Sequence, residues 1–361
     1  MAFDPHIEDF QRLGLRYVRD LDSDDPFGAA RSLARFGKKF SQNRDSLPQT
    51  DGDRAFHLVA KATDLIDYQL PFAGDAAAAK LIEEARKLLE EAVELDACCH
   101  DARRMLAAAD NPSFEDYYRF LATGADEVRQ SCEDQASKAD APEGPAREFV
   151  QTLCMLPYLR WLASLSARAL ECGHYRKSVE AALALLAIDP YDQADVRFTL
   201  ALAYAKLEDA EGLSKLVARD ATTDRPDNPW YSLARLALAY KVRNFTAAEH
   251  EVAGLLATHP EGASTLAAQD WLPDGVFSRI VVEPGSEDEL VLAVSEATVI
   301  LQEGVDSRER GALGSWLLRR PKVAAADTRE RPRQAPSTEL GTSGFGYGPD
   351  YGSESGKGGR S

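Results

Sequence analysis

The sequence predicts an all-α protein built from stacked helical hairpins, and three observations lead to this fold class. Alanine and leucine dominate the apolar residues while valine, isoleucine and threonine are sparse, which favours helix because unbranched side chains lose little rotamer freedom there. Apolar residues recur at helical spacing from about residue 53 to 318. Two segments in this range superimpose, each with a helix, a sharp turn, a second helix and a closing proline.

The first half of the chain is expected to be helical but less regular. Residues 1–52 read as a helical, partly flexible N-terminal arm, attached weakly to the rest. Residues 53–140 contain N-terminal helical repeats, with a long helical insert at 113–138. The Pro- and Gly-containing stretch 141–146 is expected to be a flexible joint before the second half.

The second half carries the clearest repeats. The superimposing segments are 157–190 and 228–260, with turns at Gly173 and Asn244, residue types that tolerate a left-handed backbone. Their closing residues, Pro190 and Pro260, lie 70 positions apart, about twice the tetratricopeptide period of roughly 34 residues. A further helix, turn and helix is recognisable at 191–220. We therefore predict three core tetratricopeptide-like repeats within 147–262, in an all-α helical-repeat solenoid.

The C-terminal part of the chain divides into two expected segments. Residues 263–318 form a connection followed by capping helices, whose Trp316 and Leu317 would close the last open apolar face. From 319 to 361 the composition changes to Pro, Arg, Ser and Gly, with too little apolar surface to offset the entropy of ordering it. The sequence predicts a disordered tail there.

Several strings resemble a known family in order and spacing. They are PYLRW at 157–161, DPYDQADVRF at 189–198, the W-Y-x3-R run at 230–235, and the SEDE and GALGSWL strings near the C-terminal end. In these strings the chain is similar to bacterial tetratricopeptide proteins related to the suppressor of tumorigenicity 7 family. The resemblance covers roughly residues 55–318 and implies a helical-repeat fold. The polar signature of that family is altered at Asp189, Gln193 and Ala194.

Charge and composition limit the function. The net charge is −17, which argues against nucleic acid as a partner because phosphate affinity depends on clustered Lys and Arg. No apolar run is long enough to span a membrane, and the acidic start differs from a secretory signal, so we expect a cytoplasmic protein. The five cysteines show no CxxC spacing, and no P-loop, GxSxG, HExxH or GxGxxG string occurs. No cofactor, metal site or enzymatic activity is expected.

Three arginines suggest a binding surface. Arg160, Arg197 and Arg235 lie near the start of successive repeat-opening helices, and stacking of the repeats would bring them into a ladder able to hold a carboxylate. Tyr158 and Tyr231, beside two of them, would be exposed in such a groove. The alternative is that each arginine pairs with an acidic neighbour and keeps the repeats in register.

The expected function is a scaffold or adaptor that binds a segment of another protein on the concave repeat surface. Two alternatives stay open. The acidic surface could serve a regulatory or chaperone-like role toward a basic partner, with the tail as a second contact. The repeats could also serve self-association.

Overall fold

The computed structural model of the chain is helical throughout its described part, with no strand among the described residues, which confirms the predicted all-α class. The structure describes residues 4–19, 26–138, 144–220, 228–269, 272, 282–303 and 310–327. Within these ranges no helix combines the length and the apolar character that crossing a membrane requires.

The described residues of the first half form six α-helices, two short 3-10 helices and one π-helix. They are α1 (Pro5–Arg19), α2 (Pro26–Asn43), η1 (Arg44–Ser46), α3 (Asp51–Thr63), the π-helical η2 (Asp64–Gln69), η3 (Leu70–Phe72), α4 (Asp75–Leu95), α5 (His100–Asp110) and α6 (Phe114–Ser137). The predicted insert at 113–138 is thus the single helix α6. Ser113 begins it as an N-cap, since its side chain accepts the N–H of Asp116.

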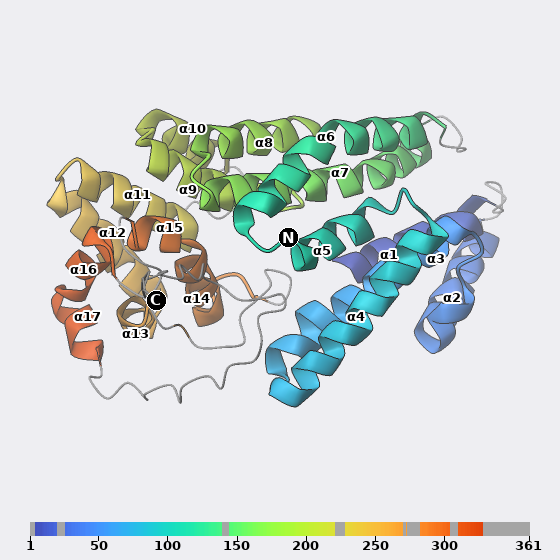
Figure 1. Cartoon of the computed structure of the whole chain (residues 1–361), viewed down its shortest axis with the longest axis horizontal. Helices are drawn as coiled ribbons and strands as arrows, with labels where there is room; N and C mark the ends of the chain where they lie inside the picture. The colour runs from blue at the N-terminus through green and yellow to red at the C-terminus, as the bar shows by residue number, and fades with distance from the viewer. Residues whose placement is uncertain are drawn as a thin grey trace, which may run out of the picture.

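The described residues of the second half form eleven helices. They are α7 (Pro145–Glu171), α8 (Tyr175–Ile188), α9 (Val196–Leu207), α10 (Ala210–Asp220), α11 (Pro229–Lys241), α12 (Phe245–Thr258), α13 (Gly262–Ala267), α14 (Glu287–Glu296), α15 (Thr298–Leu301), α16 (Ala312–Leu318) and α17 (Pro321–Ala326). In Figure 1, α6 to α10 span the molecule between the N-terminal helices α1–α4 at one end and α13–α17 at the other.

Three consecutive helix pairs, α7–α8, α9–α10 and α11–α12, are joined by turns of the same geometry. The residue with left-handed backbone is Gly173 in the first turn, Glu208 in the second and Arg243 in the third, with φ of 82°, 59° and 59°. In each turn the following N–H bonds back to a carbonyl five positions earlier, at Ala169, Tyr204 and Ala239. Both sets of positions advance by 35 residues. The same local unit therefore occurs three times in succession.

The turn at Asn244 differs from the prediction by one residue. Asn244 has φ −85° and serves as the N-cap of α12, where its side chain accepts the N–H of Ala247. The left-handed position is the preceding Arg243. The sequence reading was wrong here because Asn suits both positions, and the bond that it forms as a cap decides between them.

Proline follows the second helix in two of the pairs. Asp189 and His259 end α8 and α12, and their N–H groups bond to the carbonyls of Leu185 and Leu255 at 2.8 and 2.9 Å. Pro190 and Pro260 come next in the chain, where a residue without an N–H cannot continue the helix.

The helix that opens the first pair is longer than predicted. The superimposed segments place its start at 157, whereas α7 begins at Pro145 and contains Pro157 in its interior. Val150, Leu153 and Leu156 are buried in this extension, and α7 packs along α6. Their burial stabilises the additional turns and offsets the hydrogen bond that Pro157 cannot make.

The N-terminal segment is not the weakly attached arm that the sequence predicts. Helix α1 packs against α2 and α3, and its Leu13 lies with Phe36 of α2 in a small buried cluster. The α1 residues Glu8 and Asp9 are also buried, each 1% exposed. The prediction was wrong because these carboxylates resemble surface residues in the sequence, whereas their partners lie far along the chain.

The C-terminal boundary also shifts. The tail was expected to be disordered from 319, yet residues 319–327 are described and contain α17, which begins at Pro321. Val323 of this helix is fully buried, and α17 packs against α13 and α16. The rest of the expected tail, 328–361, lies outside the described residues.

Candidate functional site

Arg160 of α7 lies in a buried charged cluster. Its Nε donates to Asp101 of α5 at 2.6 Å, its Nη1 donates to Glu8 of α1 at 2.7 Å, and its Nη2 also bonds to Asp101. The three side chains are 11%, 3% and 1% exposed. Arg160 therefore connects three helices that are distant in sequence, and its guanidinium is not presented to a partner.

The pKa values in this cluster reflect mutual stabilisation of the charges. Burial would lower the pKa of Arg160, but the neighbouring Asp101 and Glu8 outweigh it and the pKa is raised. Burial likewise would raise the pKa of Asp101, while Arg160 and then Arg104 bring it below the ordinary value. Asp101 thus stays ionised inside the protein.

Arg197 lies at the start of α9, in the connection from α8. Its Nη2 donates to Asp195 at 2.8 Å and its Nη1 is 3.4 Å from Asp192. Asp192 also accepts the backbone N–H groups of Val196 and Arg197, the first two residues of this helix. Asp192 and Asp195 both have left-handed backbone, with φ of 53° and 54°. The Asp-rich string is therefore a folded connection in which the carboxylates satisfy local donors.

Arg235 and the two tyrosines also have partners within the chain. Arg235 of α11 donates from Nε to Glu251 of α12 at 3.0 Å. Tyr231 is fully buried and donates its hydroxyl to Asp220 of α10 at 2.7 Å, while Tyr158 is 7% exposed. Burial, and then the bond to Asp220, raises the pKa of Tyr231. The expectation that Tyr158 and Tyr231 are exposed in a groove is not met.

The three arginines thus lie on α7, α9 and α11, which contact one another in succession, and each forms ion pairs with acidic residues of this chain. Each arginine therefore pairs with acidic residues, as the alternative expects, but Arg235 pairs within its own helix pair and Arg160 pairs with α1 and α5 rather than with a neighbouring core repeat. Of the five predicted site residues, Arg197 and Tyr231 share a described partner, since both contact Asp220.

The face of α9 and α11 away from their hairpin partners is covered by C-terminal helices. Helix α14 packs against α11 and α15 packs against α9. Trp230 of α11 donates its indole N–H to Glu296 at 2.7 Å, and Lys206 of α9 donates to Glu303 at 2.8 Å. Every residue from Phe198 to Ala205 in α9 is buried. A partner that binds this face would have to displace α14 and α15.

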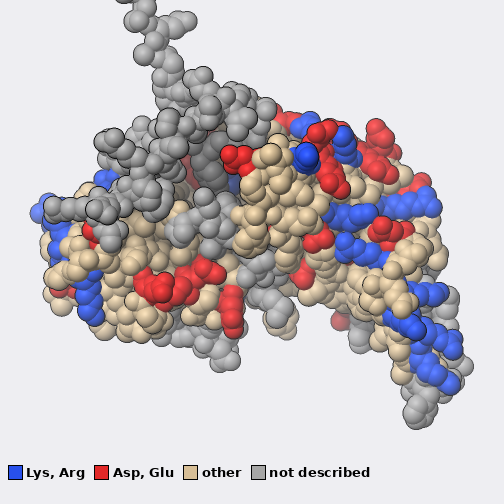
Figure 2. Space-filling view, turned by 90° about the horizontal axis from the view of Figure 1, so that it is seen from below, with Lys and Arg blue, Asp and Glu red and all other residues tan. Residues whose placement is uncertain are grey.

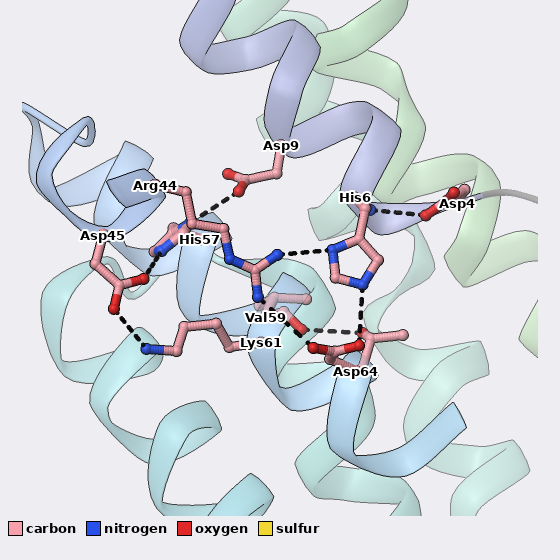
Figure 3. Close-up of polar contacts among 10 residues, drawn as sticks. Asp4, His6, Asp9, Arg44, Asp45, His57, Val59, Lys61 and Asp64 are labelled. Atoms are coloured by element: carbon pink, nitrogen blue, oxygen red, sulfur yellow. Dashed lines mark hydrogen bonds and ion pairs between the residues drawn. The ribbon is translucent and has the colours of Figure 1, made fainter. Parts of the chain in front are cut away.

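A second polar cluster joins α1, η1 and α3 (Figure 3). His57 of α3 lies between two carboxylates, with Nδ1 2.8 Å from Asp9 and Nε2 2.9 Å from Asp45. Burial lowers the pKa of His57, but these hydrogen bonds outweigh it and raise the pKa above its ordinary value. Asp45 also accepts from Lys61 at 3.2 Å. His57 in its charged form can donate to both carboxylates, which holds α1 and η1 on α3.

His6 extends this cluster at the start of α1. Arg44 donates to its Nδ1 at 3.0 Å, and its Nε2 is 3.3 Å from Asp64 (Figure 3). Sequence reasoning missed both histidines and the buried carboxylates, because their partners are separated by up to 152 residues. The one available signal was the position of Glu8 and Asp9 within a helix that is otherwise amphipathic.

The described residues contain no group of His, Cys, Asp and Glu arranged to hold a metal ion. Cysteine and histidine lie close together in the sequence at Cys98-Cys99-His100 and at Cys172-Gly173-His174. Cys99 is buried and Cys172 is partly buried, while Cys98 is exposed. Burial raises the pKa of Cys99 to about 12 and that of Cys172 to about 11. These two thiols are therefore poor nucleophiles at neutral pH.

Helix α8 presents an exposed apolar surface. Residues 181–188, AALALLAI, contain no polar side chain. Ala181, Ala182, Leu185 and Leu186 are buried against the core, but the other face remains in contact with solvent. Leu183 is 47% exposed and Ile188 44%, and Tyr191 just beyond the helix is 88% exposed. We call Leu183, Ile188 and Tyr191, with Ala184 and Ala187 between them, the α8 strip.

Comparison with family models, with curated proteins and with solved structures finds no match to this chain.

Proposed function

We propose that the chain is a tetratricopeptide-like helical-repeat scaffold that binds another protein through the α8 strip. The architecture is supported by the three helix pairs whose turns repeat every 35 residues, close to the roughly 34-residue period of such repeats. In helix pairs of this kind each pair packs against its neighbours, so that stacking produces a continuous core.

The observation that carries the binding proposal is the apolar character of residues 181–188 of α8 on both faces. A helical segment that is apolar all round is normally buried on all sides, whereas Leu183 and Ile188 stay exposed in the described structure. Leu183 and Ile188 lie five positions apart on the exposed side of α8, and the exposed Tyr191 follows three residues beyond the helix. Contiguous exposed apolar residues of this kind mark protein contact sites, where tyrosine is enriched.

The five residues suggested by the sequence have another role in this proposal. Arg160, Arg197, Tyr231 and Arg235 bond to acidic residues of other helices, and Tyr158 is part of the buried core. We keep the proposed scaffold role, but we place the partner site on α8 instead of on Arg160, Arg197 and Arg235.

Affinity purification from the native host tests this function with three forms of the chain. These are the wild type, the α8 variant Leu183→Glu/Ile188→Glu, and the control Phe72→Glu, which changes another apolar side chain that is 75% exposed. We expect the wild type and the control to recover the same partner and the α8 variant to lose at least about tenfold of it, because charges at the centre of an apolar interface are strongly unfavourable. Equal recovery by a folded α8 variant would contradict the proposal. Self-association would appear as a concentration-dependent sedimentation coefficient that the α8 variant lacks.

A further inference from the structure

Helix α2 carries a strongly basic surface on an acidic protein. Between residues 26 and 43 there are four basic residues and no acidic one, so the rest of the chain carries −21. The four are Arg31, Arg35, Lys38 and Lys39, and all are exposed. Figure 2 shows basic side chains gathered at the end of the molecule where α2 lies, while acidic side chains lie over other parts of this face.

The basic residues follow one side of the helix. Each of the positions 31, 35, 38, 39 and 42 lies three or four residues from another of them, which places the four basic residues and Gln42 on one face. A different face of α2 is buried, since Phe36 is fully covered and its ring lies 4.9 Å from that of Phe10. Packing of α2 on α1 thus fixes the direction in which the basic side chains point.

This basic face borders a hollow. The hollow has a volume of about 380 Å³ and is lined by Ser32, Arg35, Lys38, Lys39 and Gln42. The side chains of Arg35 and Lys38 form no ion pair with any residue that the structure describes. All five lining residues carry hydrogen-bond donors, and none carries a negative charge.

We propose that this face of α2 binds an acidic segment of a partner protein, with carboxylates in contact with Arg35 and Lys38. The inference goes beyond the α8 strip and does not depend on it. The face from Arg31 to Gln42 is about 16 Å long, which matches roughly five residues of extended chain.

A nucleic-acid duplex fits this surface less well than a short acidic segment. A duplex reaches well past the 16 Å face, and beyond a Debye length of about 8 Å it would meet a chain that is otherwise strongly acidic. Among the α2 residues from 30 to 43, whose exposure the structure describes, no exposed one has an aromatic ring on which a base could stack. A segment of a few carboxylates is confined to the basic face and avoids this repulsion.

The test measures fluorescence anisotropy of a labelled hexaglutamate peptide with the full chain, using hexaglutamine as the uncharged comparison. We expect hexaglutamate to bind, and Arg35→Glu/Lys38→Glu to weaken binding by about tenfold or more, because two charge-assisted contacts become repulsive. The control Lys87→Glu/Lys215→Glu changes the net charge equally on α4 and α10, where both lysines are exposed, and should leave the affinity within about twofold. Circular dichroism verifies that both variants are folded.

Three results would overturn the inference. The first is no binding of hexaglutamate at millimolar concentration, and the second is equal weakening by the two variants. The third is tighter binding of a 12-base-pair DNA duplex or of phosphatidylserine vesicles, with loss in the α2 variant, which would assign the face to another class of polyanion. Since the α8 strip is intact in all of these proteins, the outcome is independent of the proposed scaffold function.

Discussion

Removing Arg160 provides the sharpest prediction about stability. In Arg160→Ala, Glu8 and Asp101 stay buried while three hydrogen bonds from the guanidinium are lost. Breaking a buried ion pair from one side costs about 3–5 kcal/mol, since the remaining charge is desolvated without compensation. We expect the lower end, about 3 kcal/mol, because Arg12 still contacts Glu8 at 2.5 Å and Arg104 lies 3.6 Å from Asp101. This corresponds to a loss of about 100-fold in the folding equilibrium.

Urea unfolding of the full chain, followed by circular dichroism, measures this loss. Arg235→Ala is the matched control, because Arg235 is 30% exposed and its pair with Glu251 is partly solvated, so that it should cost less than about 1 kcal/mol. The triple variant Arg160→Ala/Asp101→Asn/Glu8→Gln should recover part of the stability by removing the uncompensated charges. A loss below about 1 kcal/mol for Arg160→Ala would refute the reasoning that this cluster is buried and stabilising.

Three further predictions concern single residues. Because the pKa of His57 is raised in the folded state, its contribution to stability is complete below about pH 6.5 and is lost as the pH rises through the folded-state pKa. The difference in unfolding free energy between wild type and His57→Gln should therefore shrink from pH 6 to pH 8.5. A constant difference in urea unfolding would contradict this. Burial, only partly opposed by Arg104, raises the pKa of Asp67 to about 6, so ionisation of Asp67 lowers the stability above that pH. Asp67→Asn should therefore be more stable than wild type by about 1–2 kcal/mol at pH 7.5 but not at pH 4. Urea unfolding at the two pH values tests this difference. Arg243 has φ 59° at the position that Gly173 occupies in the equivalent turn. Arg243→Gly should therefore raise the stability by about 1 kcal/mol, whereas Gly173→Val should lower it. If calorimetry gives both changes the same sign, the two turns are not equivalent.

Local features of this fold follow from the sequence, and long-range ones do not. The helical class and the turn at Gly173 could be predicted, because helix periodicity and left-handed backbone depend on neighbouring residues. Glu208 and Arg243 hold the same backbone geometry without being glycine, so the equivalence of the turns is visible only in their φ values and hydrogen bonds. In the sequence, Glu or Arg at this position does not indicate a left-handed backbone.

The candidate site was predictable only in part. The spacing of Arg160, Arg197 and Arg235 places them on successive helices, but the identity of their partners depends on which helices meet. Glu8 and Arg160 are 152 residues apart, and no periodicity links them. The apolar string at 181–188 is readable in the sequence, yet one-sided exposure results from the absence of a described neighbour over that face of α8. The covering of α9 and α11 by α14 and α15 likewise depends on tertiary packing.

Hydrogen–deuterium exchange tests the central claim most directly, with the chain alone and in complex with the host protein that it recovers. The account predicts that binding slows exchange across 181–191, which contains the α8 strip, and leaves exchange in α14 and α15 unchanged. Faster exchange across 287–301 on binding, together with unchanged exchange in α8, would contradict it. That result would show that the partner displaces the C-terminal helices and binds the face of α9 and α11 instead.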